Sequence, residues 1–188
     1  MHLTETCEAH LPIIVTHVET TSAPITDDAM TATIHAELAR KGLLPDEHIV
    51  DTGYIDAQLL VESQHDYAID LVGPARKNWH RQATEHTDYD CDHFPIDWEN
   101  QNATCPQGHT SVSWLPAVDN RKNGVIKIKF STIDCRACPA RLLCTPTTSP
   151  PRRTLTIRRQ AHYLALNQRR TPGEDQGVYP GVGQTSRN

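Results

Sequence analysis

Four cysteines in the second half of the chain constrain its folding more than any other feature. Cys105 stands alone in "TCPQGHTS", whereas Cys135, Cys138 and Cys144 stand together in "DCRACPARLLC". Two thiolates separated by two residues can bind one metal ion from a tight turn, and a lone cysteine of a neighbouring hairpin can complete a tetrahedral shell. Such a site contributes folding free energy to a unit that is too small to bury its own core.

Zinc is the metal that four thiolates in this arrangement favour first. The spacing of one distant cysteine followed by C-x2-C-x5-C also resembles the cysteines of an iron–sulfur cluster in some nucleases, so such a cluster is the alternative. His109 could replace one thiolate, although four thiolates already complete the shell. The alternative to a metal site is that the four cysteines are unrelated buried thiols that bind no metal. Cys7 and Cys91 are expected to be free thiols in a reducing compartment.

The formal net charge of -5 conceals a division between the two halves of the chain. Residues 1–100 hold 19 acids and 5 Lys or Arg, a balance of -14. Residues 101–188 hold 4 acids and 13 Lys or Arg, a balance of +9. This asymmetry indicates that the second part faces a polyanion such as DNA, or else presents a basic surface to solvent.

The length of 188 residues allows one domain of ordinary size with a small appendage. No run of residues approaches the ~20 apolar residues of a membrane helix, and the N-terminus has no signal-peptide pattern. We therefore expect a soluble, cytoplasmic protein that does not contact a membrane.

Residues 1–74 alternate between strand and helix patterns in the order β-β-α-β-α-β, which predicts an α/β fold. In the first helix, Met30, Ile34 and Leu38 recur at four-residue steps on one face, after a cap at Thr26 or Asp27 and before a stop at Gly42. Residues 2–7, 13–20, the segment ending at 51 and residues 67–74 read as strands, and 55–64 as the second helix. Because residue 1 already lies in a strand pattern, we expect some of the sheet to be missing ahead of it.

Asp51 stands at the end of the third predicted strand. Ile49 and Val50 read as the buried end of that strand, and Gly53 supplies a turn. A carboxylate that leaves a sheet at the carboxyl end of a strand is well placed to bind a ligand. The alternative is that Asp51 caps the helix that begins near Ile55.

The second half begins with polar residues from 75 to 97, which predict a loop or an insertion. In "GVIKIKF", Lys127 and Lys129 alternate with apolar residues, so we expect a strand with one basic and one buried face. A short helix is expected at 161–170, and the tail 171–188 reads as disordered. DNA contacts are assigned to four arginines beside the cysteine unit: Arg152, Arg153, Arg158 and Arg159.

Three stretches together resemble the DDE transposases of bacterial insertion sequences, in the group with a Cys-rich insertion between the second and third catalytic acids. They are "HLTETCEAHLPIIVTHVETT", "DEHIVDTGYIDAQLLVES" and the block from "IDWENQNATCPQGHTS" through "IKIKFSTIDCRACPARLLC". The resemblance implies a partial ribonuclease H-like mixed sheet with flanking helices, plus a small four-cysteine metal-binding β insertion. It divides the chain into a partial catalytic core at 1–74, the insertion at 75–150, a basic return segment at 151–170 and the tail at 171–188.

The resemblance also implies a chemistry. The intact family cleaves DNA and transfers strands with two Mg²⁺ ions held by three acids, and its members commonly act as oligomers. Asp51 matches the second acid, whereas the first lies ahead of the strand that begins here. Glu174 and Asp175 stand near the place of the third acid but lack its sequence pattern. We therefore expect a transposase fragment that is inactive alone, with a non-catalytic zinc- and DNA-binding remnant as the alternative.

Overall fold

The computed structural model describes residues 1–74 and 89–170, so the predicted tail at 171–188, with Glu174 and Asp175, lies outside the described residues. None of the helices in these two ranges has the length and apolar composition of a membrane span. The first range contains β1 (His2–Glu5), β2 (Val15–Glu19), α1 (Asp27–Lys41), β3 (Glu47–Ile49), the 3-10 helix η1 (Thr52–Tyr54), α2 (Ala57–Tyr67) and β4 (Asp70–Val72). The second contains η2 (Cys91–His93), β5 (Ile96–Asp97), β6 (Asn102–Ala103), β7 (Ser113–Val118), β8 (Gly124–Lys129), α4 (Thr132–Ala137), α5 (Arg141–Cys144), β9 (Thr154–Arg158) and α6 (Gln160–Arg170).

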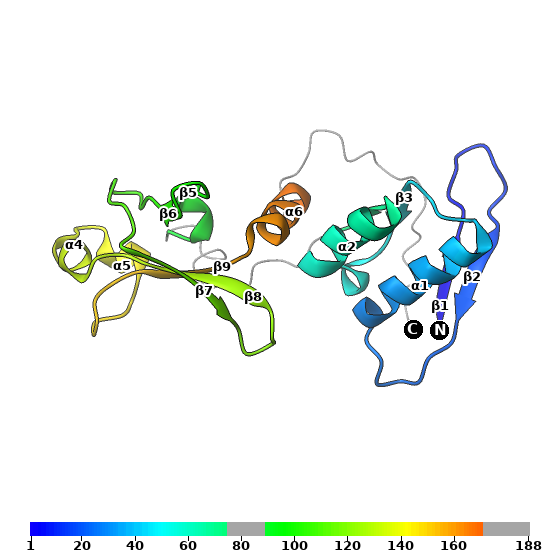
Figure 1. Ribbon diagram of the computed structural model, residues 1–188, viewed down its shortest axis with the longest axis horizontal. Coiled ribbons are helices and arrows are strands. Elements are labelled where there is room, and N and C mark those ends of the chain that lie inside the picture. The colour runs from blue at the N-terminus through cyan, green and yellow to red at the C-terminus, as the bar shows by residue number, and fades with distance from the viewer. Residues whose placement is uncertain (75–88, 171–188) are drawn as a thin grey trace, which may run out of the picture.

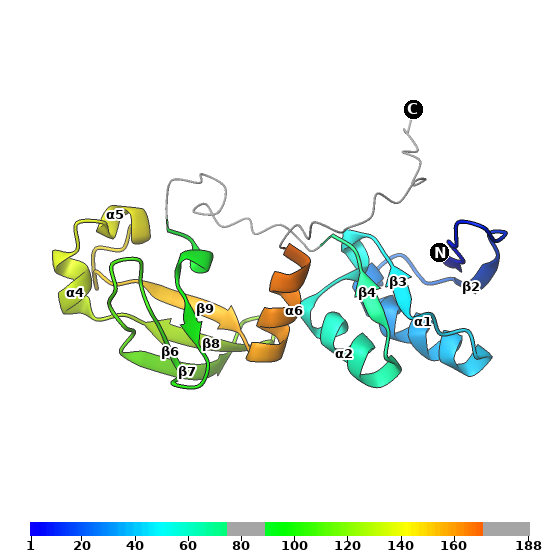
Figure 2. The same cartoon turned by 90° about the horizontal axis from the view of Figure 1, so that it is seen from above.

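The first part confirms the predicted α/β class and the order of its elements. β1 and β2 pair antiparallel, β3 and β4 pair parallel, and α1 packs against both α2 and β2. In Figures 1 and 2 this part lies at one end of the molecule. Within the described residues the four strands form two separate two-stranded sheets.

Local signals place the ends of both helices. Gly42 has a left-handed backbone with φ 67°. Its N–H donates to the Ala39 carbonyl and the N–H of Leu43 donates to the Leu38 carbonyl, which confirms the predicted stop of α1. α2 begins two residues later than predicted because Asp56 is its N-cap. The Asp56 carboxylate accepts a hydrogen bond from the N–H of Leu59 at 2.8 Å.

The prediction that Ile49 and Val50 end a buried strand is wrong. β3 ends at Ile49, whose side chain is 36% exposed, and Val50 is only half-buried. Neighbouring residues of a strand point to opposite faces, and here His48 takes the face toward α1. Ile49 therefore lies on the face that α1 does not cover.

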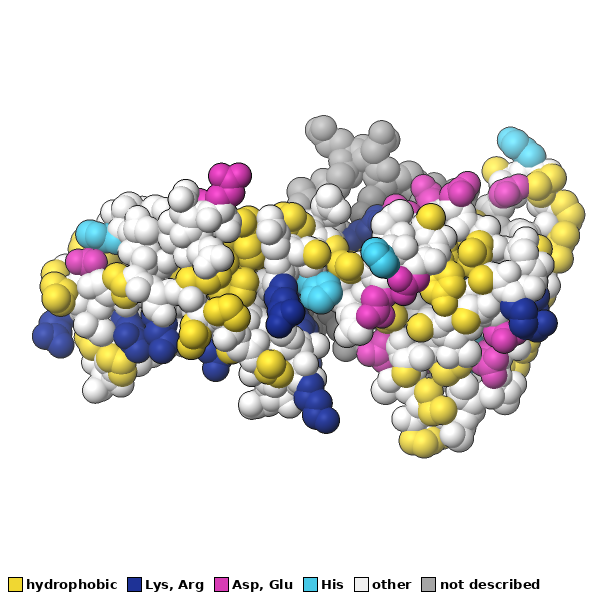
Figure 3. All heavy atoms as spheres, in the orientation of Figure 1, with side chains coloured by type: hydrophobic (Ala, Val, Ile, Leu, Met, Phe, Trp, Pro, Cys, Tyr) yellow, Lys and Arg dark blue, Asp and Glu magenta, His cyan; other side chains and the backbone are white. Residues whose placement is uncertain are grey.

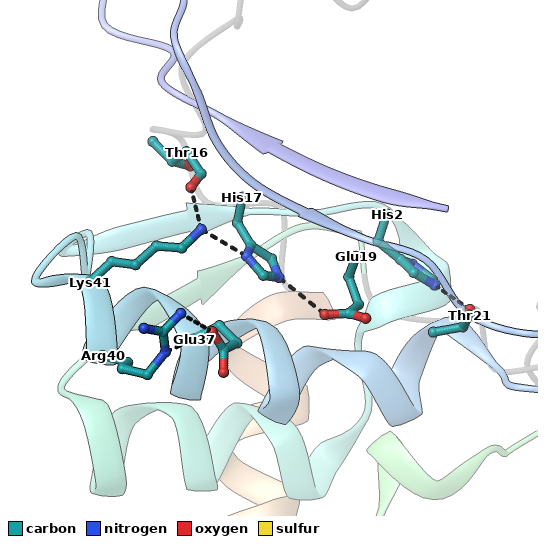
Figure 4. Close-up of polar contacts among 8 residues, drawn as sticks. All are labelled: His2, Thr16, His17, Glu19, Thr21, Glu37, Arg40 and Lys41. Carbon is teal, nitrogen blue, oxygen red and sulfur yellow. Dashed lines mark hydrogen bonds and ion pairs between the residues drawn. The ribbon is translucent and has the colours of Figure 1, made fainter.

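Polar side chains, rather than apolar ones, connect the hairpin of β1 and β2 to α1. Lys41 Nζ donates to the Thr16 carbonyl at 2.9 Å and lies 3.0 Å from Nδ1 of His17, which is buried (Figure 4). His2, also buried, lies 3.1 Å from the Thr21 hydroxyl, and its Nδ1 lies 3.9 Å from Oδ1 of Asp27 in α1. These contacts fix the hairpin on the helix, while Leu3 and Val18 on its opposite face stay about half exposed.

A second pair of histidines lies between α1, α2 and β3. Nε2 of His35 is 2.9 Å from Nδ1 of His48, and the ring of Tyr67 packs on His35. His35 is 1% exposed. Burial lowers the pKa of His35 to about 4, and the neighbouring His48 adds to the shift. Burial also lowers the pKa of His48.

The second part contains a three-stranded antiparallel sheet in the order β7-β8-β9. The prediction of alternating faces in β8 is confirmed, because Ile126 and Ile128 are buried while Lys127 is exposed. Phe94 and Phe130 pack against each other in the same core, with ring centroids 5.5 Å apart.

Helix α6 joins the two parts (Figures 1 and 2). Its Tyr163 packs on the core of the second part, where the ring contacts Trp98. Ala165 and Leu166 pack against the buried residues of α2 and β4, and Arg169 forms an ion pair with Asp70. The helix predicted at 161–170 is therefore confirmed, and it is the element that connects the sheet to α2.

The buried histidines predict that the first part loses stability in acid. The unfolded chain takes up a proton on His35 as the pH falls from about 6.5 to about 4, whereas the folded chain does not. Stability is therefore full above pH 6.5 and is lost through that window, with roughly 2 kcal/mol lost between pH 7.5 and 5 from His35. Urea denaturation at pH 7.5 and at pH 5 measures this loss of unfolding free energy.

The matched variants are His35→Gln and His65→Gln, because His65 has an 84% exposed side chain. His35→Gln should flatten the pH dependence, and His65→Gln should leave it unchanged. An equal pH dependence in all three proteins would contradict the assignment to His35.

Candidate functional site

Asp51 lies at the carboxyl end of β3 and is exposed. Its carboxylate accepts a hydrogen bond from the N–H of Gly53 at 2.7 Å and so caps the short helix η1. The interpretation that Asp51 caps the next α-helix is wrong, because Asp56 performs that role. The Asp51 carboxylate is therefore exposed at a strand end without being needed to start α2.

Asp27, the first residue of α1, brings a second carboxylate to the same turn. A Cβ atom at Gly53 would lie 2.9 Å from Oδ2 of Asp27 and 3.0 Å from Oδ1 of Asp51. The two carboxylates thus occupy the space that a side chain at residue 53 would need. Glycine in "DTGY" therefore does more than turn the chain, since its lack of a side chain lets both carboxylates approach the backbone.

Tyr54 fixes the turn to α1 and β1. Its hydroxyl lies 2.6 Å from Nδ1 of His2, and its carbonyl accepts a hydrogen bond from the Thr31 hydroxyl at 3.0 Å. Burial raises the pKa of Tyr54, and the charges of Asp27 and Asp51 add to the shift. Sequence reasoning missed His2 and Asp27, because their contacts with the turn join residues far apart in the chain.

The carboxylates at this turn do not fit a two-metal centre. Asp27 and Asp51 converge on Gly53, yet in the ranges 1–74 and 89–170 no group of three or more His, Cys, Asp or Glu residues could hold a metal ion as placed. Mg²⁺ is bound by several oxygens in near-octahedral geometry, and two ions need more ligands than two carboxylates provide.

The four cysteines predicted to bind metal line a single pocket in the second part: Cys105, Cys135, Cys138 and Cys144. Cys105 lies in the loop after β6, Cys135 lies within α4, Cys138 is the C-cap of α4, and Cys144 ends α5. His109 lines the same pocket. As the thiols lie, they do not form a ready metal-binding group within the described residues. Cys7 and Cys91 are free thiols, as predicted.

Arg153 is turned toward this pocket. Its Nη1 donates to the Cys144 carbonyl at 2.8 Å, and its guanidinium lies 5.4 Å from the ring centroid of Phe94. Burial raises the pKa of the Cys144 thiol to about 11, Arg153 opposes the shift, and the neighbouring thiols add to it. Arg153 thus supports the end of α5, where Cys144 lies.

The four arginines predicted to contact DNA do not form one patch. Arg152 and Arg153 precede β9 near the cysteine pocket, while the other two lie at its far end. Arg158 pairs with Asp119 at 4.0 Å, and the exposed Arg159 lies against Gly124. The strand β9 therefore separates the two pairs.

A family model described as "Transposase DDE domain" matches residues 104–178. The resemblance to the DDE transposases is confirmed. The match covers less than half of the chain; it includes the four pocket cysteines and the four arginines, whereas Asp51 lies outside it. No curated protein and no solved structure matches the chain.

The two aspartates around η1 should differ sharply in their effect on stability. Asp56→Ala removes the N-cap of α2 and should cost about 1 kcal/mol. Asp51→Ala, at an exposed cap of a three-residue helix, should cost less than half of that. Urea denaturation of the two variants measures the difference. A larger loss for Asp51→Ala would show that Asp51 serves chiefly to stabilise the fold.

Proposed function

We propose that this chain carries part of a transposase catalytic domain and acts on DNA, with Asp51 as one of the catalytic acids. The match to the transposase DDE domain at 104–178 supports the family. Asp51 is exposed at the carboxyl end of one strand of a parallel pair, which is the edge where α/β sheets bind their ligands. That position is the single observation that carries the assignment of Asp51.

Under this proposal, β1–β2 and β3–β4 are two parts of one ribonuclease H-like mixed sheet flanked by α1 and α2. The packing of α1 on β2 and of α2 on β4 supports this arrangement. Residues 1–74 then form the partial catalytic core, 75–150 the insertion with the cysteine pocket, and 151–170 the basic return segment. In the last of these, α6 brings the chain back onto α2.

The cysteine pocket is proposed as a structural zinc site. All four cysteines line one pocket although they come from three separate segments, and Cys105, Cys135 and Cys138 lie near enough to Cys144 to raise the pKa of its thiol. Four thiolates are a ligand set of structural zinc sites. A shell of four thiolates leaves no open position for substrate, so zinc there would stabilise the fold and take no part in catalysis. An iron–sulfur cluster is the competing occupant.

The purified chain should contain close to one zinc per molecule. Cys135→Ser should lower the zinc content strongly and unfold the second part, because its core is small and packs against the cysteines. Cys7→Ser is the matched control, since Cys7 is exposed and remote from the pocket lining. Elemental analysis and tryptophan fluorescence measure both effects, because Trp98 and Trp114 pack in that core.

Detection of iron and sulfide together with visible absorbance would show that an iron–sulfur cluster, and not zinc, occupies the pocket. Chain with neither metal after anaerobic, chelator-free purification would overturn the metal site. Equal zinc in Cys135→Ser and Cys7→Ser would also reject the pocket as the binding site.

The chain alone should not nick DNA. Two carboxylates at the Asp51 turn provide too few oxygens to hold two Mg²⁺ ions, so the remaining acids must be supplied from elsewhere for catalysis. Supercoiled plasmid incubated with the chain and Mg²⁺ or Mn²⁺ should stay supercoiled. Nicking by the wild type that Asp51→Ala abolishes would show that a complete acid cluster is present, and would also reject a non-catalytic zinc- and DNA-binding remnant.

A further inference from the structure

The sheet β7-β8-β9 has two faces of opposite character. One face packs on the core, with Ile128 of β8 placed between Trp114 of β7 and Leu155 of β9. β5, β6 and η2 contribute to that core through Ile96, Ala103 and the neighbouring Phe94. In Figure 1, β5 and β6 lie on one side of the sheet.

The other face is covered at its start, where Val125 of β8 is buried, and is polar and basic beyond it. Lys127 pairs with Thr156 of β9, and Lys129 pairs with Thr154. Lys127 and both threonines are exposed, and Lys129 is partly exposed. On the β7 side, Lys127 pairs with Leu115, which is 53% exposed. The middle of this face is therefore open to solvent, with two lysines side by side on the central strand.

The charge around this face is positive. Residues 101–170 hold 2 acids and 12 Lys or Arg, and residues 89–100 of the same part add 4 acids and no Lys or Arg, so residues 89–170 hold 6 acids against 12 Lys or Arg. One of these acids, Asp119, pairs with Arg158. Figure 3 shows Lys and Arg side chains along the lower edge of this part, whereas Asp and Glu side chains gather over the part with α1 and α2.

The aromatic residues of the sheet unit distinguish between nucleic-acid partners. In the described part of this unit, Phe94, Trp98, Trp114, Phe130 and Tyr163 all belong to the core or pack against it. Proteins that bind single strands stack the bases on exposed aromatic rings. A face of lysines and threonines without such rings suits the phosphates of a duplex.

We infer that the open face of β7-β8-β9 binds the phosphate backbone of duplex DNA, with Lys127 and Lys129 as its central cationic contacts. Thr154 and Thr156 flank them as neutral hydroxyl donors. The inference rests on the proposed action on DNA and adds to it the surface and the form of the DNA. The sequence predicted DNA contacts at four arginines, whereas the contacts inferred from the structure lie on the two lysines. Arg153 is turned toward the cysteine pocket and not toward the open face.

The test measures duplex binding by the full, metal-loaded chain across a salt series, using fluorescence anisotropy with a labelled duplex of about two helical turns. The double variant Lys127→Gln/Lys129→Gln removes two charges from the open face. The matched control, Arg40→Gln/Arg136→Gln, removes two charges from exposed residues of α1 and α4. Thermal unfolding and zinc content verify that all proteins are folded.

The lysine variant should bind about tenfold more weakly at low salt, and its salt slope should fall by about two, one for each phosphate that a lysine no longer neutralises. The control should stay within about twofold of the wild type. Equal losses in both variants would overturn the inference about this face while leaving action on DNA in place. A wild type that binds no duplex would overturn both. Tighter binding to a single strand of the same length would overturn the commitment to a duplex.

Discussion

The arrangement of the two parts of the molecule depends on helix α6, which packs against the core of the sheet and against the buried residues of α2 and β4. α6 follows β9 directly, and its Tyr163 packs on the core of the sheet while Leu166 packs against α2. The ion pair of Arg169 with Asp70 ties the end of the helix to β4. Because α6 continues from the edge strand of the sheet, its contacts with α2 position the sheet against the α/β part.

The sheet unit is small, and this explains why its cysteines matter. Among the residues that the structure describes, its buried core cluster contains seven, and Cys105, Cys135 and Cys144 pack on that cluster. A unit of this size buries little apolar area to offset the loss of chain entropy. A metal ion that joined the loop after β6 to α4 and α5 would add the missing stabilisation. The proposed zinc therefore supports the basic sheet without contacting DNA.

The turn at Asp51 has a different organisation. Gly53 lets two carboxylates approach the backbone, and Tyr54 anchors the turn through His2. Each contact joins elements that lie far apart in the sequence. The turn therefore depends on the hairpin and on α1, and it presents Asp51 without using it to cap an α-helix.

The sequence predicted what depends on local patterns. The stop of α1 at Gly42 follows from the left-handed backbone that glycine allows, and the two faces of β8 from Ile126 to Lys129 follow from alternation. The convergence of the cysteines on one pocket was also predicted from their spacing. Whether they bind zinc remains a prediction.

What the sequence could not predict depends on tertiary contacts. Ile49 looked buried by composition, but its neighbour His48 takes the covered face. Arg153 was assigned to DNA from its charge, yet its direction is set by the Cys144 carbonyl and by Phe94. Asp27 was expected only as a possible cap of α1, and nothing local places it beside Asp51.

If the chain acts on DNA through its second part, the basic sheet face must lie toward the duplex. Amide chemical-shift mapping of the isotope-labelled, metal-loaded chain during titration with duplex DNA is the decisive measurement, because each residue reports separately. We expect salt-sensitive shifts centred on Lys127, Lys129, Thr154 and Thr156. Shifts centred in residues 1–74, or spread evenly over both parts, would contradict this placement of the DNA.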